Sequence, residues 1–211
     1  IERLEMHGIP VVSANTDGVV IQCPVDKIPE MDAIVEWWEQ ITGFETEATE
    51  YVAIYSRDVN NYIALKAGGG VKTKGAYAST SLSKSPANEI CTEAVVAYLE
   101  SGTPIEQTIH ACTDIRKFIT LRQVRGGAVW KGESLGRVVR WYYACGETAT
   151  IHDMSSGNTV ARSQGSRPCM VLPDVLPTDM DLDWYVREAR EMLSDLGVGE
   201  SAHPPVQMAL M

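Results

Sequence analysis

Two short apolar runs near the start of the chain flank a group of polar turn residues. Residues 9–14 and 19–23 are mostly apolar, and residues 15–18, Asn-Thr-Asp-Gly, separate them. Asparagine, aspartate and glycine accept the backbone angles of a tight turn, so this pattern predicts a β-hairpin with polar residues at its tip. An amphipathic segment over residues 1–7, followed by a glycine, predicts a short helix before the hairpin.

The spacing of apolar residues becomes helical after the hairpin and strand-like after that. Over residues 28–42 apolar side chains recur at helical intervals, which predicts an amphipathic helix. Apolar and aromatic runs at residues 51–55, 61–65 and 71–77, separated by turn-forming residues, predict three further strands. Antiparallel strands around one helix predict an α+β fold with a palm-like antiparallel sheet and a helix packed on it.

A polar, serine-rich stretch over residues 79–86 changes the pattern and predicts a boundary between subdomains. Beyond it helical patterns dominate, apart from a short hairpin around residues 156–158. The predicted helices cover residues 87–100, 104–111, 114–123 and 181–196, with residues 137–143 as a further helical segment. We therefore expect one subdomain over residues 1–80, a mostly helical one over residues 81–200 and a flexible tail over residues 201–211.

The composition is that of a soluble globular protein, with 45% hydrophobic and 22% charged residues among 211. No apolar run is long enough to cross a bilayer, so we expect no membrane segment. The formal net charge of −10 argues against a dedicated nucleic-acid-binding module, which is usually basic. Basic residues nevertheless gather over residues 66–74 and 116–140, which allows one face of the molecule to contact DNA.

The cysteines and the N-terminus indicate the cellular setting. Five cysteines are scattered without a Cys-x-x-Cys pair, a pattern typical of reduced thiols in a cytoplasmic protein. The spacing of zinc ligands is missing, and the first residues do not form a secretory signal. The chain begins with Ile rather than Met, within a predicted helix, which suggests a piece of a longer protein.

Asp17, at the predicted hairpin tip, is the main candidate for chemistry. A carboxylate on a tight turn is rigid and exposed, and Mg²⁺ prefers oxygen ligands while keeping several waters. In two-metal phosphoryl chemistry the ions lie roughly 3.5–4 Å apart and clamp the attacking and leaving oxygens. The alternative is that residues 15–18 are simply a good turn, since Asp-Gly turns are common.

The hairpin resembles the Tyr-x-Asp-Thr-Asp-Ser motif of family B DNA polymerases. Thr16 and Asp17 fall where that motif has its Thr and its second Asp, while Asn15 replaces the first Asp and Gly18 replaces the Ser. The resemblance implies that Asp17 is a catalytic metal ligand. It also implies a two-metal magnesium site whose second carboxylate lies outside this chain.

Two later segments resemble DNA-contacting segments of the same family. Residues 60–66 are similar, around Tyr62, to a Lys-Lys-Arg-Tyr-like segment, although the basic residues before the Tyr are missing. Residues 71–75 resemble a Lys-x-Lys-Gly segment and supply Lys72 and Lys74, which should share one face of a strand. The resemblance implies that these three side chains contact the primer strand. Taken alone, without the resemblance, Tyr62 is better interpreted as a core tyrosine and the two lysines as a solvated strand edge.

The second half of the chain resembles phage-type thumbs of this family, chiefly over residues 135–143 and 173–185. Arg137 and Arg140 would contact duplex phosphates, or else lie on a solvated helical face. The last five residues, 207–211, resemble the short peptides by which bacterial polymerases bind sliding clamps. In all, the resemblance spans residues 1–197 and rests on the order of its segments.

The family's upstream Asp-x-x-Ser-Leu-Tyr-Pro segment, its Lys…Asn-Ser-x-Tyr-Gly helix and its exonuclease domain do not occur in this sequence. The resemblance therefore implies an incomplete polymerase, inactive alone, whose partners are primer–template DNA, deoxynucleoside triphosphates and the rest of the polymerase chain. A phage or bacterial origin implies the cytoplasm of a bacterial cell.

Two other readings stay open. In the first, the chain is a non-catalytic α+β binding module and Asp17 is only a turn residue, which predicts neither metal dependence nor DNA affinity. In the second, it is a nucleotide cyclase-like palm, which predicts nucleotide binding without primer–template binding.

Overall fold

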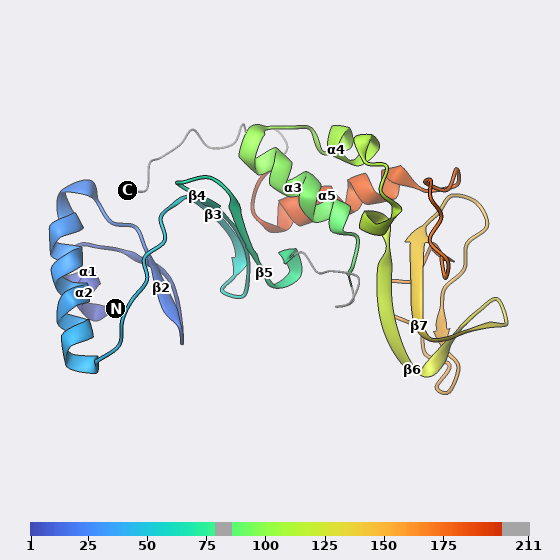
Figure 1. Cartoon of the computed structure of the whole chain (residues 1–211), viewed down its shortest axis with the longest axis horizontal. Helices are drawn as coiled ribbons and strands as arrows, with labels where there is room; N and C mark the ends of the chain where they lie inside the picture. Colours follow the sequence, from blue (N-terminus) through green and yellow to red (C-terminus); the bar gives the residue numbers. More distant parts are fainter. Residues whose placement is uncertain (79–85, 200–211) are drawn as a thin grey trace. The chain divides into compact units, whose positions relative to one another are not determined.

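The computed structural model describes residues 1–78 and 86–199, and these divide after Tyr77 into two compact units (Figure 1). Each unit combines helices with antiparallel sheets, which confirms the predicted α+β class. No helix within these ranges is long and apolar enough to cross a membrane. The assignment of the units to a palm and a thumb stays a prediction. The predicted tail, residues 201–211, lies outside the described residues.

The first unit contains the predicted hairpin, helix and three further strands. In chain order its elements are α1 (Glu2–Met6), β1 (Val11–Asn15), β2 (Gly18–Ile21), the 3₁₀ turn η1 (Val25–Lys27), α2 (Ile28–Thr42), β3 (Tyr51–Asp58), β4 (Asn61–Lys66), β5 (Val71–Lys74) and the 3₁₀ turn η2 (Gly75–Tyr77). The strands form two separate sheets, of order β1-β2 and β3-β4-β5, where the sequence had suggested one.

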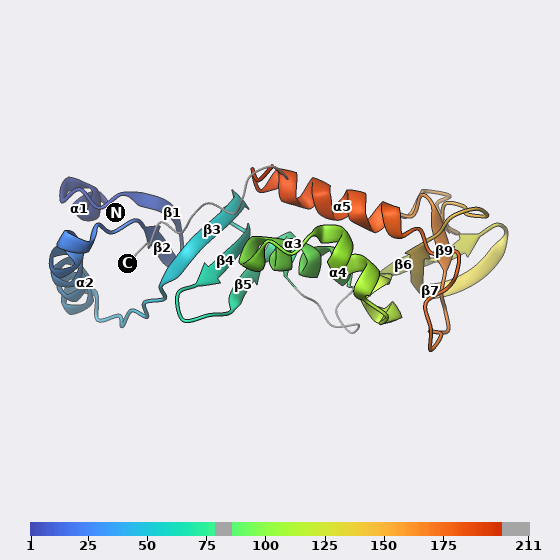
Figure 2. The ribbon, with the colours of Figure 1, turned by 90° about the horizontal axis from the view of Figure 1, so that it is seen from above.

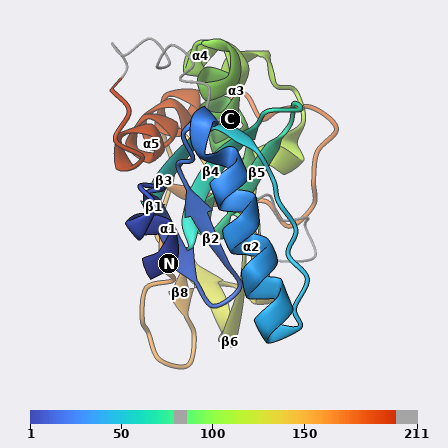
Figure 3. The ribbon, with the colours of Figure 1, turned by 90° about the vertical axis from the view of Figure 1, so that its left-hand side faces the viewer.

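Local sequence explains where α2 begins and ends. Pro29 lies in its first turn, where the missing N–H costs no helical hydrogen bond. Gly43 ends it with φ of 72°, and its N–H donates to Glu39 O at 2.8 Å. α2 lies beside α1 (Figure 3) but contributes no buried side chain, so its apolar residues remain partly open to solvent.

The second unit packs three helices together beside a four-stranded antiparallel sheet. Figure 2 shows α5 running along α3 and α4, which it contacts. The sheet has the order β8-β6-β7-β9. The elements are α3 (Glu89–Ser101), α4 (Ile105–Ala111), the 3₁₀ turn η4 (Ile115–Phe118), β6 (Thr120–Trp130), β7 (Glu133–Tyr143), β8 (His152–Asp153), β9 (Ser166–Pro168) and α5 (Leu182–Asp195).

Tyr185 of α5 ties the helices to the sheet in the core of this unit. Its side chain is fully buried, and its hydroxyl donates to Phe118 O at 2.9 Å while accepting from Tyr143 N at 2.9 Å. The rings of Phe118 and Tyr185 meet edge to face, with centroids 5.0 Å apart. Asp181 caps α5 by accepting from Trp184 N at 2.9 Å, which confirms the predicted final helix.

Two helical predictions for this unit are wrong. Only residues 115–118 of the segment 114–123 are helical, as a 3₁₀ turn, and β6 begins at Thr120. Residues 137–143 form part of strand β7, because their valines and aromatic residues favour a strand and pair with β6 from Thr120 onward. The predicted hairpin around residues 156–158 is present, since His152 and Thr159 form an antiparallel bridge across it.

Candidate nucleic-acid interface

The three-stranded sheet of the first unit brings Tyr62, Lys72 and Lys74 onto one face. β4 and β5 pair antiparallel, with Tyr62 opposite Lys74 and Ala64 opposite Lys72. Residues directly opposite each other in such a pair project from the same face, and alternate residues of one strand do so too. The sheet register therefore groups a tyrosine of β4 with two lysines of the neighbouring strand β5.

Two further side chains complete this face. Lys66 lies on the same side of β4 as Tyr62 by alternation, and Tyr51 of β3 stands opposite Lys66. We call these five residues, Tyr51, Tyr62, Lys66, Lys72 and Lys74, the basic–aromatic face. The sequence analysis did not place Tyr51 with these residues, because its position on this face depends on the register of β3 against β4. The other face of the sheet carries Ile63 and Leu65, both buried.

The tyrosines lie close to the lysine ammonium groups. A hydrogen bond with the Tyr51 side chain, together with charge interactions with Tyr51 and Tyr62, raises the pKa of Lys72 above its ordinary value. Lys74 Nζ lies 6.0 Å from the centre of the Tyr62 ring. Because the Lys72 pKa moves further above neutrality, its ammonium stays charged across the physiological pH range. The face therefore presents fixed positive charge next to aromatic rings.

A polar clamp at one end of the sheet holds Tyr62 and Lys74 in place. The Asn61 amide nitrogen donates to both oxygens of Asp58 at 2.8 Å, and the Asn61 amide oxygen accepts from Ala76 N at 2.7 Å. Hydrogen bonds from the Asn60 backbone N–H and the Asn61 side chain lower the pKa of Asp58. The clamp joins the residue before Tyr62 to the segment that follows Lys74.

Gly75 is required by this clamp. Its φ of 65° lies in the left-handed region that residues with a side chain rarely adopt. A Cβ at this position would lie 2.9 Å from Asn61 Cγ and closer still to Asn60 O and Asn61 Oδ1. The glycine that ends the Lys-Thr-Lys-Gly segment is thus explained by local geometry.

Asp17 lies at the exposed tip of the β1–β2 hairpin, as the sequence predicts. Asn15 pairs with Gly18, and Asn15 Oδ1 accepts from the backbone N–H groups of Asp17 at 2.8 Å and Gly18 at 3.0 Å. Thr16 Oγ1 donates to Asp17 Oδ1 at 3.3 Å. Asn15 therefore holds the turn with its side-chain oxygen.

Within the described part of the chain, Asp17 is not a member of a metal-binding group of side chains. Among residues 1–78 and 86–199, no group of three or more His, Cys, Asp or Glu side chains is placed to hold a metal ion. A magnesium ion at Asp17 would need its further oxygen ligands from water or from another polypeptide segment. Asp17 also belongs to a different sheet from the basic–aromatic face.

Arg137 and Arg140 lie on strand β7 of the second unit and not on a helix. They are three positions apart on a continuous stretch of strand, so they project from opposite faces. Arg140 Nη1 donates to Met170 O at 3.1 Å. The expectation of one shared helical face is therefore wrong, and the two side chains cannot form a single row of phosphate contacts.

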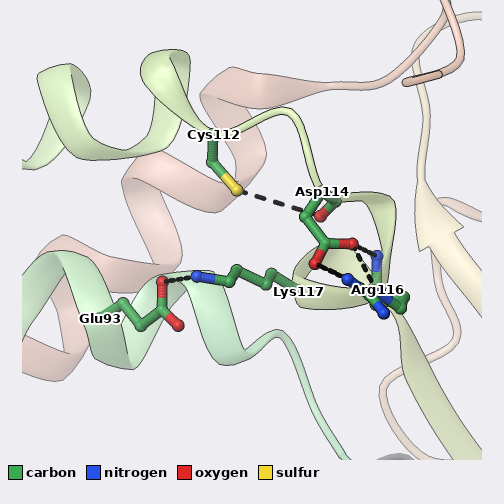
Figure 4. Close-up of polar contacts among 5 residues, drawn as sticks. All are labelled: Glu93, Cys112, Asp114, Arg116 and Lys117. Atoms are coloured by element: carbon green, nitrogen blue, oxygen red, sulfur yellow. Dashed lines mark hydrogen bonds and ion pairs between the residues drawn. The ribbon is translucent and has the colours of Figure 1, made fainter.

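Other basic residues of the second unit are neutralised by ion pairs. Figure 4 shows Arg116 held by both oxygens of Asp114, with nitrogen–oxygen distances of 2.6–3.1 Å, and Lys117 bonded to Glu93 at 2.7 Å. The pKa of Asp114 is lowered chiefly by its hydrogen bond from the Arg116 side chain. The gathering of basic residues seen in the sequence over 116–140 is thus partly cancelled by acidic partners.

The chain is similar to a solved structure but to no family model or curated sequence. No protein-family model matches the chain, and no curated protein sequence matches it. Among solved structures, the chain is similar to the family B DNA polymerase from the hyperthermophilic archaeon Pyrobaculum calidifontis, with 15% identity and a TM-score of 0.49. The match covers 95% of this chain and 28% of the polymerase. A likeness of this size assigns neither a family nor an activity, and the predicted phage-like character stays a prediction.

Proposed function

We propose that the chain is part of a DNA polymerase of the family B type and that its basic–aromatic face contacts the backbone of primer–template DNA. The observation that carries this proposal is the grouping of Lys66, Lys72 and Lys74 with two tyrosines on one face of the β3-β4-β5 sheet. Lysine ammonium groups bind phosphates without regard to base sequence. A replicative enzyme needs this kind of contact along the duplex.

The catalytic part of the proposal rests on Asp17. Its exposed carboxylate at the hairpin tip would supply one oxygen ligand to Mg²⁺, and the resemblance assigns the second carboxylate to a segment outside this chain. Bound there, magnesium would stabilise negative charge that develops on the transferred phosphate. The deoxynucleotide site would likewise come from the rest of the polymerase. Two predictions stay open: clamp binding by residues 207–211, which lie outside the described residues, and the cytoplasmic location.

A duplex-binding measurement tests the DNA interface. Fluorescence anisotropy of a labelled primer–template duplex would compare the chain with a Lys72→Gln/Lys74→Gln variant. Each phosphate contact contributes a slope of about 0.9 to the dependence of log K on log salt, so we expect this variant to lower the slope by about 1.8. Duplexes of unrelated sequence should bind equally well.

Lys131→Gln is the matched control, because Lys131 carries the same charge but already pairs with Glu147 at 2.6 Å. It should leave affinity and salt slope nearly unchanged. The double variant removes two charges and Lys131→Gln removes one. If Lys131→Gln lowers the salt slope by half as much as the double variant does, only net charge matters, and the proposed face would be rejected.

The gene tests the catalytic part separately. The reading frame before the Ile1 codon should encode Asp-x-x-Ser-Leu-Tyr-Pro and then a Lys…Asn-Ser-x-Tyr-Gly segment. In that complete protein, Asp17→Asn should abolish primer extension while leaving duplex binding intact. A closed frame, with no neighbouring gene that encodes those segments, would refute the catalytic role. It would leave the non-catalytic binding module as the function of the chain.

A further inference from the structure

The acidic residues of the chain are concentrated in its first fifty positions. Residues 1–50 contain eleven Asp and Glu residues and only Arg3 and Lys27 as basic ones, whereas residues 51–78 contain four basic residues and one Asp. The segment that forms α1, the hairpin and α2 therefore carries nearly all of the chain's net charge of −10. Such a surface repels phosphate groups and attracts cations.

An apolar cluster lies within this acidic segment. Trp38, Ile41 and Phe44 are 40%, 60% and 66% exposed, and we call them the α2 cluster. The rings of Trp38 and Phe44 stack with centroids 5.9 Å apart and an angle of 19° between their planes. Contiguous exposed apolar side chains, and aromatic ones above all, mark surfaces where proteins bind each other.

Hydrogen bonds between Glu39 and Thr46 hold the segment after α2, which contains Phe44, in place before any partner binds. Glu39 Oε1 accepts from the backbone N–H of Thr46 at 2.6 Å and from its hydroxyl at 2.5 Å. These two hydrogen bonds lower the pKa of Glu39, so its carboxylate is charged at neutral pH. They tie the short loop after Thr42, which contains Phe44, back to the last turns of α2, where Trp38 lies. The cluster needs no rearrangement before a partner binds.

Acidic side chains border the cluster and select the charge of a partner. Glu45 and Glu47 follow Phe44 in sequence, and both are exposed. The guanidinium of Arg3, on α1, lies 3.5 Å from the centre of the ring of Trp37, the α2 residue next to Trp38, so an aromatic side chain of α2 already contacts a cation. A ligand with apolar side chains flanked by Lys or Arg matches both features.

We propose that the α2 cluster binds a basic, amphipathic segment of a polypeptide. Apolar side chains of that segment cover Trp38, Ile41 and Phe44, and its cations face the surrounding carboxylates. Nucleic acid and anionic membrane are disfavoured by the same negative charge. This docking surface is independent of the proposed DNA contact and goes beyond it.

The probe is a fluorescein-labelled synthetic peptide with leucines at helical spacing and lysines elsewhere. Its affinity for the chain is measured by anisotropy, beside a control peptide in which glutamate replaces every lysine. Ile41→Ser/Phe44→Ser should weaken binding of the lysine peptide by about tenfold, as expected for the loss of central apolar contacts. Glu45→Gln/Glu47→Gln should weaken it less and reduce its salt dependence.

Val171→Ser/Val175→Ser is the matched control, since these side chains of the second unit are 86% and 73% exposed. It should leave the affinity unchanged, and circular dichroism checks that both double variants fold. Equal binding of the glutamate peptide, or equal losses in the two serine variants, overturns the proposal. So does a chain dimer, seen by sedimentation, that Ile41→Ser/Phe44→Ser abolishes and that the lysine peptide does not displace.

Discussion

Replacing Gly75 by alanine should destabilise the β3-β4-β5 sheet more than its conformation alone explains. A side chain in the left-handed region costs roughly 1–2 kcal/mol. The new Cβ would also displace the Asn61 side chain, which it approaches to 2.9 Å at Cγ, and so break the hydrogen bond to Ala76 N. Loss of a hydrogen bond with steric displacement adds about 1–2 kcal/mol, for a total of about 2–4 kcal/mol.

Gly43→Ala isolates the conformational part of that cost. Gly43 has φ of 72°, close to the 65° of Gly75, but a Cβ there meets no atom within 4 Å. We expect this variant to lose only about 1–2 kcal/mol. The difference between the two variants therefore measures the clash with the clamp around Asn61.

Hydrogen exchange of the β4 and β5 amides under increasing urea reads the stability of this sheet without interference from the second unit. Gly75→Ala should lower the opening free energy of these amides well beyond the effect of Gly43→Ala. If both variants lose the same amount, the clamp does not fix the end of the sheet. The explanation given for the Lys-Thr-Lys-Gly segment would then be wrong.

Three further changes test the second unit. Tyr185→Phe should lower the free energy of unfolding by about 1–3 kcal/mol in urea denaturation, because a buried carbonyl and a buried N–H both lose their partner. The lowered pKa of Asp114 means that its pair with Arg116 stabilises the fold above the ordinary Asp pKa and is lost as pH falls through the folded-state pKa. On acidification, Asp114→Asn should therefore lose less unfolding free energy than the unchanged chain. The difference should be no more than about 1 kcal/mol, because the ion pair is largely exposed. Burial raises the pKa of Cys91 to about 12, so iodoacetamide at pH 8 should label the exposed Cys145 first and Cys91 only on unfolding, as mass spectrometry would show.

Hydrophobic spacing predicted most elements of the first unit because its signals are local. The Asn-Thr-Asp-Gly turn, Pro29 at the start of α2 and Gly43 at its end each act within a few residues. Their effects do not depend on the rest of the fold. The predicted bounds of α2, residues 28–42, agree with the structure.

The prediction from sequence was wrong where pairing between distant strands decides the structure. Residues 137–143 read as a helix, but β7 pairs with β6 across a turn at Lys131 and Gly132, both with positive φ. An eleven-residue strand with a bulged partner keeps no simple alternation of apolar residues, since its buried positions run together from Trp141 to Tyr143. Arg137 and Arg140 were misplaced for the same reason.

For the candidate DNA face too, local motifs could be recognised in the sequence and strand pairing could not. Tyr62, Lys72 and Lys74 were proposed from short motifs and strand alternation, which are local signals. Tyr51 was not, because its position depends on how β3 aligns with β4 and on the register shift between Tyr51 and Ala53. The net charge of the whole chain also gave no indication of this basic face, since the acidic residues among the first fifty outnumber the basic ones that follow in residues 51–78.

The first unit carries two proposed surfaces of opposite charge, the basic–aromatic face and the α2 cluster. We expect each to bind its own ligand independently of the other. Lys72→Gln/Lys74→Gln should weaken duplex binding and leave the affinity for the leucine–lysine peptide unchanged. Ile41→Ser/Phe44→Ser should do the reverse, since these side chains carry no charge and lie on another element. Both ligands are measured by anisotropy on the same protein preparations, so a folding defect would show as a loss of both. If each double variant lowers both affinities while circular dichroism stays unchanged, the two surfaces are one. A single mixed site would then replace the separation of a DNA-binding face from a protein-binding one.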